Sequence, residues 1–289
     1  MRSASHRVLT VIWSAVLAFL ILAFGSGCWA LLLAANFKSH AVFPWSVPVM
    51  ALVLWLMWQY LGGSWWPRSN SDSRRRYRRT NPVSGQAFAW ALLAGVLAVV
   101  ALAAYWIVLF QLVRTPPNKL PSMEGYPHLT ILLVLVMASL VAPFTEEPAF
   151  RGYCQVILER NFSAPAAVAI SSLFFALAHL TYGLYWTKLL VYFLVGVTPG
   201  VIAYLANSIW ATIPVHIIAD LSFFTLVWPH DAARRLVSQG GADPRFWLHV
   251  LQAILFTTLA VLAFSRLAKV TASSRAAAGN RLLSDPIPG

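Results

Sequence analysis

The sequence from His128 to Arg151 reads HLTILLVLVMASLVAPFTEEPAFR. The part through Phe144 is almost entirely apolar, and its length suits a transmembrane helix, which needs about 20 such residues. Two adjacent acids, Glu146 and Glu147, follow between two prolines. A carboxylate at membrane depth costs at least ~2.5–3.5 kcal/mol, so such residues usually have a partner or a function. This stretch predicts a membrane protein with polar chemistry inside its helices.

The composition of the whole chain agrees with this prediction. Of its 289 residues 59% are hydrophobic and 10% are charged, and 13 are tryptophan. Soluble domains carry roughly 25% charged residues, whereas tryptophan is frequent at membrane interfaces. The net charge of +12 comes from basic residues in loops between apolar runs. We therefore expect membrane lipids, and no nucleic acid, as partners. Two cysteines indicate neither a disulfide framework nor a zinc knuckle.

The apolar runs predict an all-α polytopic transmembrane bundle of about eight spans. Because the first run is longer than a signal sequence, we expect it to stay uncleaved. No internal repeat is visible. The predicted spans are Val8–Ala35, Val42–Leu61, Gln86–Val113, His128–Phe144, Ala164–Thr181, Leu189–Ala206, Ile209–Trp228 and Phe246–Phe264.

Lysine and arginine in the loops predict the orientation, because cytoplasmic loops are enriched in them. With the N-terminus inside, 14 of the 21 basic residues fall in cytoplasmic segments and 7 outside, Lys188 among the latter. Both termini are then cytoplasmic. The run from Arg74 to Arg79 is interpreted as a topology anchor on a solvated cytoplasmic loop, residues 62–84. We expect an integral protein of a bacterial cytoplasmic membrane.

Three polar clusters lie within the apolar runs. In the first, Glu147 and Arg151 are four residues apart and can pair along one helix face, which leaves Glu146 free. Phe175 and His179 form the second cluster. At 1.5 Å per residue, Glu146 and His179 lie at about the same height above a turn at 161–163. The third is His216 with Asp220, again four apart, where a carboxylate can orient the imidazole.

Taken in order, these clusters resemble the CPBP family of intramembrane proteases, which includes the CAAX-processing endoproteases and bacterial Abi proteins. The family pattern is Glu-Glu-x-x-x-Arg, Phe-x-x-x-His and His-x-x-x-Asn. This chain has EEPAFR at 146–151, FALAH at 175–179 and HIIAD at 216–220. Asp220 stands where the enzymes commonly have asparagine, and an ionised aspartate cannot donate a hydrogen bond. The resemblance covers about residues 128–228.

The resemblance implies an endopeptidase that cleaves a membrane-associated peptide or protein. Glu146 would be the general base, His179 would help to hold the water, and His216 would stabilise the oxyanion, oriented by Asp220. Glu147 and Arg151 would brace the site, with Phe175 in support. The alternative cofactor is zinc, held by Glu146, His179 and His216, since three such ligands and an open position make a catalytic zinc site. The spacing lacks His-Glu-x-x-His, so glutamate-activated water is the preferred reading.

Two other functions remain open at this point. Buried Glu, His and Asp also mark transporters and proton relays, although the lack of a repeat counts against that reading. The departure at Asp220 leaves room for an inactive membrane scaffold of the same fold. The expected organisation is an N-terminal membrane region at 1–127 with three helices, a catalytic core at 128–228, and a last helix with a basic cytoplasmic tail at 229–289.

Overall fold

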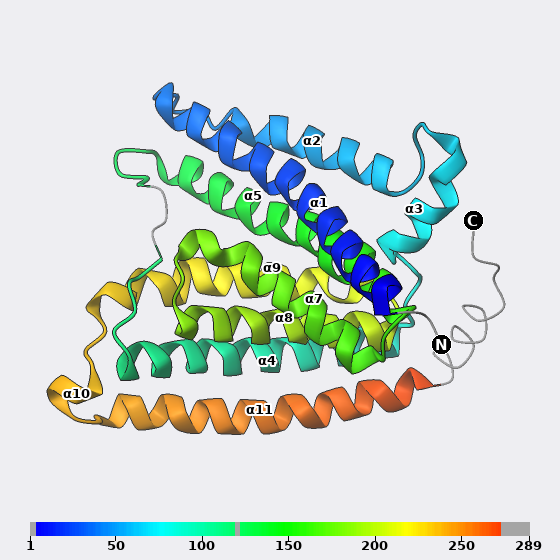
Figure 1. Ribbon diagram of the computed structural model, residues 1–289. Coiled ribbons are helices and arrows are strands. Elements are labelled where there is room, and N and C mark those ends of the chain that lie inside the picture. The colour runs from blue at the N-terminus through cyan, green and yellow to red at the C-terminus, as the bar shows by residue number, and fades with distance from the viewer. Residues whose placement is uncertain (1–3, 119–121, 273–289) are drawn as a thin grey trace.

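The computed structural model describes residues 4–118 and 122–272, in which the regular elements are all helices. The predicted all-α polytopic bundle is confirmed (Figure 1). Three short helices, α3 (Ser71–Arg78), α6 (Gln155–Glu159) and α10 (Val237–Gly240), lie between longer ones. The longer helices are α1 (Ala4–Lys38), α2 (Ser46–Leu61), α4 (Gly85–Leu112), α5 (His128–Glu146), α7 (Ala164–Ala178), α8 (Trp186–Ala206), α9 (Ile213–Ser222) and α11 (Pro244–Val270).

Seven helical segments of the described chain are long and apolar enough to cross a membrane, one fewer than the eight predicted spans. The difference is α2, which is apolar but has only 16 residues. Its length is about 24 Å at 1.5 Å per residue, against a hydrocarbon core of about 30 Å. The helix begins late in the run Val42–Leu61 because Pro44 disfavours helix at the preceding residue.

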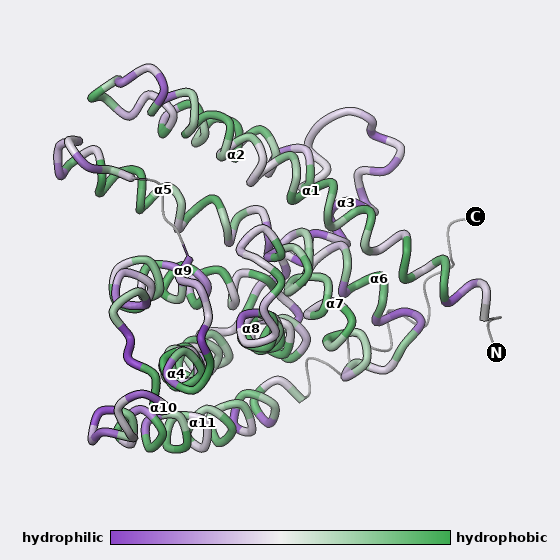
Figure 2. The backbone as a smooth tube through the Cα atoms, turned by 60° about the vertical axis from the view of Figure 1, so that its left-hand side comes forward, coloured by the Kyte–Doolittle hydropathy of each residue, from purple (hydrophilic) through white to green (hydrophobic). Residues whose placement is uncertain are grey.

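The helices form a bundle in which α7, α8 and α9 occupy the middle. Helices α1, α2 and α5 lie together on one side, and α4 with α11 on the other (Figures 1 and 2). Small residues permit close approach between the central helices, as is common in membranes. A Cβ added to Gly196 of α8 would lie 3.0 Å from the Cα atom of Ser172 in α7. One added to Gly95 of α4 would overlap Val215 of α9.

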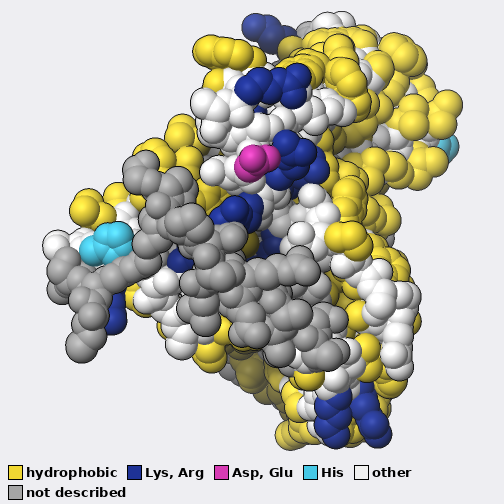
Figure 3. All heavy atoms as spheres, turned by 90° about the vertical axis from the view of Figure 1, so that its right-hand side faces the viewer, with side chains coloured by type: hydrophobic (Ala, Val, Ile, Leu, Met, Phe, Trp, Pro, Cys, Tyr) yellow, Lys and Arg dark blue, Asp and Glu magenta, His cyan; other side chains and the backbone are white. Residues whose placement is uncertain are grey.

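The segment 62–84 contains helix α3, and two of its arginines are buried, so the prediction of a solvated basic loop holds only for the exposed Arg68, Arg75 and Arg76. Arg74 is 4% exposed, and its guanidinium donates to the carbonyl groups of Tyr60, Trp65 and Pro67 at 2.5–2.8 Å. Lys and Arg side chains do gather on this end of the molecule, while hydrophobic side chains cover its flank (Figure 3). Carbonyl groups at and after the end of α2 need hydrogen-bond donors when they are buried, and the Arg74 side chain supplies these donors.

Arg79 connects this segment to residues of the later helices. It is 3% exposed and forms a two-armed contact with Glu159 at 2.9 and 3.0 Å. Its side chain also donates to Asn207, which ends α8, and to the carbonyl of Arg151. Paired and hydrogen-bonded in this way, a buried guanidinium is tolerated.

Lys188 lies in α8 and is 2% exposed, so its assignment to an outer loop is wrong as well. Its ammonium group donates to Asn118 at 2.7 Å and to the carbonyl of Tyr182 at 2.9 Å. Helix α8 starts three residues before the predicted span Leu189–Ala206. The prediction began the span after Lys188, but a lysine with polar partners can lie inside a helix bundle.

Candidate active site

The two adjacent acids lie where α5 changes into a π-helix, Glu147–Cys154. Pro148 has no N–H group to donate to the carbonyl of Phe144, and its ring would collide with that carbonyl in a regular α-helix. The carbonyl accepts a hydrogen bond from the indole of Trp58 at 2.9 Å instead. Such wide turns occur frequently at functional sites. The segment continues through α6 to Glu159, just before the turn assumed at 161–163.

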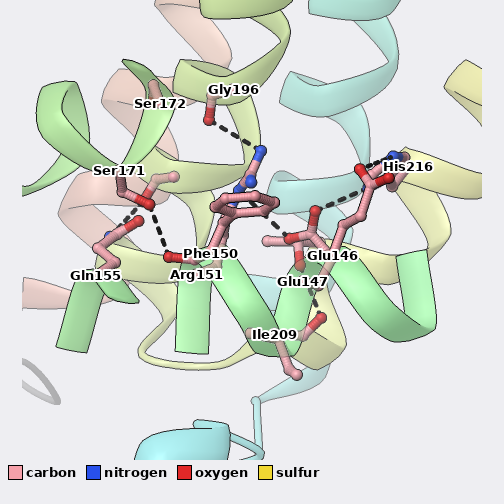
Figure 4. Close-up of polar contacts among 12 residues, drawn as sticks. Glu146, Glu147, Phe150, Arg151, Gln155, Ser171, Ser172, Gly196, Ile209 and His216 are labelled. Carbon is pink, nitrogen blue, oxygen red and sulfur yellow. Dashed lines mark hydrogen bonds and ion pairs between the residues drawn. The ribbon is translucent and has the colours of Figure 1, made fainter. Parts of the chain in front are cut away.

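Glu147 is the fully buried centre of the polar cluster (Figure 4). Its Oε1 atom accepts from Nδ1 of His216 at 2.8 Å, and its Oε2 atom lies 3.7 Å from Nε of Arg151. Arg151 also donates to the carbonyl of Gly196 at 3.2 Å and lies 4.4 Å above the ring of Phe175. The predicted pair of Glu147 and Arg151 is present, and it joins the π-helix to α8 and α9.

His216 lies among three carboxylates. Its Nδ1 atom faces Glu147, while Nε2 lies 3.8 Å from Oε2 of Glu146 and 3.7 Å from Oδ1 of Asp220. The imidazole is therefore oriented by the hydrogen bond that its Nδ1 atom donates to Glu147, and Asp220 lies near the opposite nitrogen. The spacing of four within α9 indicated only the local partner, because nothing in that spacing reveals an acid on another helix.

His179 directly follows the last residue of α7. Its Nδ1 atom donates to the carbonyl of Phe175 at 2.8 Å, which leaves Nε2 as the nitrogen able to accept a proton. The imidazole is stacked against the ring of Tyr192 at 4.4 Å and against Tyr182 at 6.1 Å. Phe175 touches both histidines, with ring centroids 4.6 Å from His179 and 6.2 Å from His216.

A cavity of about 100 Å³ brings the four proposed catalytic residues to one place. Glu146, His179, His216 and Asp220 all line it. Oε2 of Glu146 and Oδ2 of Asp220 are buried without a hydrogen-bond partner in the described chain. The described side chains show no direct contact between Glu146 and His179, and the cavity is large enough to hold water. A water can therefore complete the set.

The aromatic wall of this cavity was not foreseen from the sequence. It consists of Trp106, Tyr182, Tyr192, Phe223 and Trp228, contributed by segments far apart in the chain. Polar contacts hold two of these residues: Asn118 donates to the hydroxyl of Tyr192, and Trp106 donates to Asp231. The one available signal was Lys188, a lysine at the edge of an apolar run.

Zinc held by Glu146, His179 and His216 is the alternative cofactor predicted for this site. In the described chain, three His, Cys, Asp or Glu side chains are nowhere grouped so as to hold an ion. Nδ1 of His216 contacts Glu147, and Nδ1 of His179 contacts the Phe175 carbonyl, so Nε2 of each imidazole is left free of these partners. Oε2 of Glu146 and Oδ2 of Asp220, which have no hydrogen-bond partner in the described chain, can bind a water molecule, because a buried water needs several polar neighbours.

Comparison with known proteins bears on this cluster directly. Residues 128–222 match the family model described as type II CAAX prenyl endopeptidase Rce1-like. This confirms the resemblance to CPBP intramembrane proteases. No curated protein and no solved structure matches the chain. The Rce1-like segment begins with α5 and ends with α9, so it contains every proposed site residue. At the family level, the match supports an intramembrane endopeptidase.

Proposed function

We propose that this protein is an intramembrane endopeptidase in which Glu146 activates the attacking water. One observation carries the proposal: Oε2 of Glu146, buried and without a hydrogen-bond partner among the described residues, faces a small cavity that two histidines also line. General base catalysis requires a carboxylate within hydrogen-bond reach of a water. Glu147 does not fulfil this requirement, because its oxygens face His216 and Arg151.

In the proposed reaction, a water held between Glu146 and Nε2 of His179 gives its proton to Glu146 and attacks the peptide carbonyl. The carbonyl oxygen becomes an oxyanion, which accepts a hydrogen bond from Nε2 of His216. For this, His216 carries protons on both nitrogens, a form that the surrounding carboxylates support. The C–N bond then breaks, and Glu146 returns the proton to the leaving amine.

Asp220 takes a separate place in this proposal. Its carboxylate lies beside the nitrogen that would donate to the oxyanion, at 3.7 Å. Because an ionised aspartate cannot donate to the oxyanion itself, we assign it the stabilisation of protonated His216. The family's asparagine would supply a dipole at the same position.

The substrate class follows from the position of the cavity among membrane helices. We propose a membrane-associated peptide or protein as substrate and membrane lipids as the other partner. The more specific proposal that the substrate is a prenylated CAAX peptide is supported by family analogy alone. We further propose that the protein resides in a bacterial cytoplasmic membrane with both termini in the cytoplasm.

Proteolysis in proteoliposomes tests the proposal, with a fluorogenic farnesylated peptide and a set of bacterial membrane peptides as probes. Glu146→Gln keeps the shape of the side chain and should lower the rate at least ~10²-fold, the usual minimum for a positioned base. Glu124→Gln, at an exposed loop position, is the matched control and should retain full activity. Full activity of Glu146→Gln would exclude the mechanism and leave a transporter or a scaffold.

Metal removal separates the two hydrolytic chemistries. Because Glu146 activates the water without an ion in this proposal, activity should survive 1,10-phenanthroline, and the purified protein should contain zinc well below one equivalent. Loss of activity on chelation, restored by added zinc, would favour the metal-dependent alternative.

A further inference from the structure

A second pocket, of about 400 Å³, lies at the end of the bundle away from α3, where α10 and the start of α11 meet the end of α4 (Figures 1 and 2). We call it the basic pocket, because three guanidinium groups and two imidazoles line it. It has no part in the proposed reaction. Its defining residues are Gln111, His230, Arg234, Arg235, Arg245 and His249.

The charges of the basic pocket are only partly compensated within the protein. Arg234 pairs with Asp231 at 2.9 Å. Arg235 and Arg245 pair with no acid in the described chain. Asp243 also lines the pocket, but one of its oxygens accepts from the backbone N–H of Phe246 and caps α11. The positive end of the α11 dipole points toward the same space, which further favours an anion.

The neighbouring surface indicates what kind of anion fits. In the first two turns of α11, beside Arg245 and His249, three large apolar side chains are exposed: Trp247 at 59%, Leu248 at 60% and Leu251 at 61%. Exposed leucines on a membrane-spanning helix face acyl chains, and tryptophan marks the interface. The basic pocket therefore lies at the depth of lipid headgroups, where arginine binds phosphate with two parallel hydrogen bonds.

We propose that the basic pocket binds the phosphate of an anionic phospholipid whose acyl chains lie along the exposed face of α11. Arg235 and Arg245 supply the charge, and the imidazoles and the amide of Gln111 are within reach of headgroup hydroxyls. The buried Oε1 atom of Gln111 has no partner in the described chain and can accept from such a hydroxyl. A free phosphate ion would satisfy the arginines but would leave the apolar face of α11 unused.

The pocket also adjoins the wall of the catalytic cavity. Arg234 pairs with Asp231, which accepts a hydrogen bond from the indole of Trp106 at 2.9 Å, and Trp106 lines the cavity. Because Arg234 belongs to this connection, it is unsuitable for a selective test. Arg235 and Arg245 are exposed and make none of these contacts.

The test uses the full chain, purified and delipidated in detergent, with thermal unfolding followed by tryptophan fluorescence. Short-chain phosphatidylglycerol should raise the unfolding midpoint of the wild type, while inorganic phosphate at equal concentration should not. Arg235→Gln with Arg245→Gln should lose most of the shift. Arg266→Gln with Lys269→Gln, which removes two exposed charges at the other end of α11, should keep it.

Native mass spectrometry of the same proteins supplies a second measurement that does not depend on stability. The wild type and the control should retain more phosphatidylglycerol than phosphatidylcholine, and the pocket variant should lose this preference. Equal retention by the pocket variant and the control would overturn the proposal. A shift with inorganic phosphate as large as that with phosphatidylglycerol would overturn the lipid assignment.

Discussion

Glu147 shows how a single side chain can serve two partners. It accepts from His216 and faces Arg151, both almost fully buried. The sequence allowed the pair with Arg151 to be predicted, because the two are four residues apart. It did not allow the contact with His216 to be predicted, because 69 residues separate the two positions.

Glu147→Gln should act on stability as well as on rate. The amide can still accept from His216, but it leaves the Arg151 charge uncompensated, and an unpaired buried charge costs about 3 kcal/mol or more. We expect a lower midpoint of thermal unfolding in detergent and a smaller yield of folded protein. Glu146→Gln is the comparison, since its Oε2 atom has no hydrogen bond to lose in the described chain. Equal stability of the two variants would contradict the bracing role of Glu147.

Asp220→Asn tests the departure from the family pattern. If Asp220 only stabilises protonated His216, asparagine should keep the peptidase rate within about tenfold of the wild type, which is about 1.4 kcal/mol in the barrier. Steady-state hydrolysis at neutral pH measures this. A complete loss of function would instead indicate that Asp220 carries a proton, as in a relay, because asparagine cannot do so.

At the scale of elements, the π-helix and α3 pack against each other. The sequence contains a local signal for the distortion of the first but none for the burial of arginines in the second. The prolines around the two glutamates are visible in the sequence, and their effect on the backbone is local. Helix α3 was taken for a solvated loop, because six arginines within 68–79 resemble a topology signal. The partners that bury Arg74 and Arg79 lie elsewhere in the chain, and composition does not reveal them.

Gly152→Ala tests the contact between these two elements. An added Cβ would lie 2.7 Å from the carbonyl oxygen of Tyr77 and 3.2 Å from that of Arg78, so the end of α3 has to move. Overpacking of this kind costs about 1–3 kcal/mol, and the unfolding midpoint should fall accordingly. Gly27→Ala in α1, where a Cβ meets nothing within 4 Å, should leave the midpoint unchanged or raise it.

At the scale of the molecule, the sequence was sufficient for the helical class and for most of the spans, because apolar length is a local property. It was insufficient for the aromatic wall of the cavity, which forms only when α4, α8 and the segments that follow α7 and α9 pack together. The same limit applies to α2, whose late start reduces an apolar run of adequate length to a helix of 16 residues.

Orientation in the membrane is a prediction for the whole molecule. With Cys28 and Cys154 replaced by alanine, a cysteine at exposed Asp72 should resist a membrane-impermeant maleimide in intact cells, whereas one at exposed Ala242 should react. The reason is the excess of basic residues on the α3 end. The opposite labelling pattern would invert the topology and place the basic pocket in the inner leaflet.

The 69 positions between Glu147 and His216 also matter while the chain is being made. The ribosome releases the segment 128–159 well before α9, so the acids reach the translocon without their imidazole. Glu147 and Arg151 lie on the same helix and can enter the bilayer as a neutral pair, which lessens the insertion cost of about 2.5–3.5 kcal/mol for each charge. Glu146 has no such companion. We therefore expect the nascent chain to hold one acid without an opposite charge until α9 brings Nε2 of His216 to 3.8 Å from it.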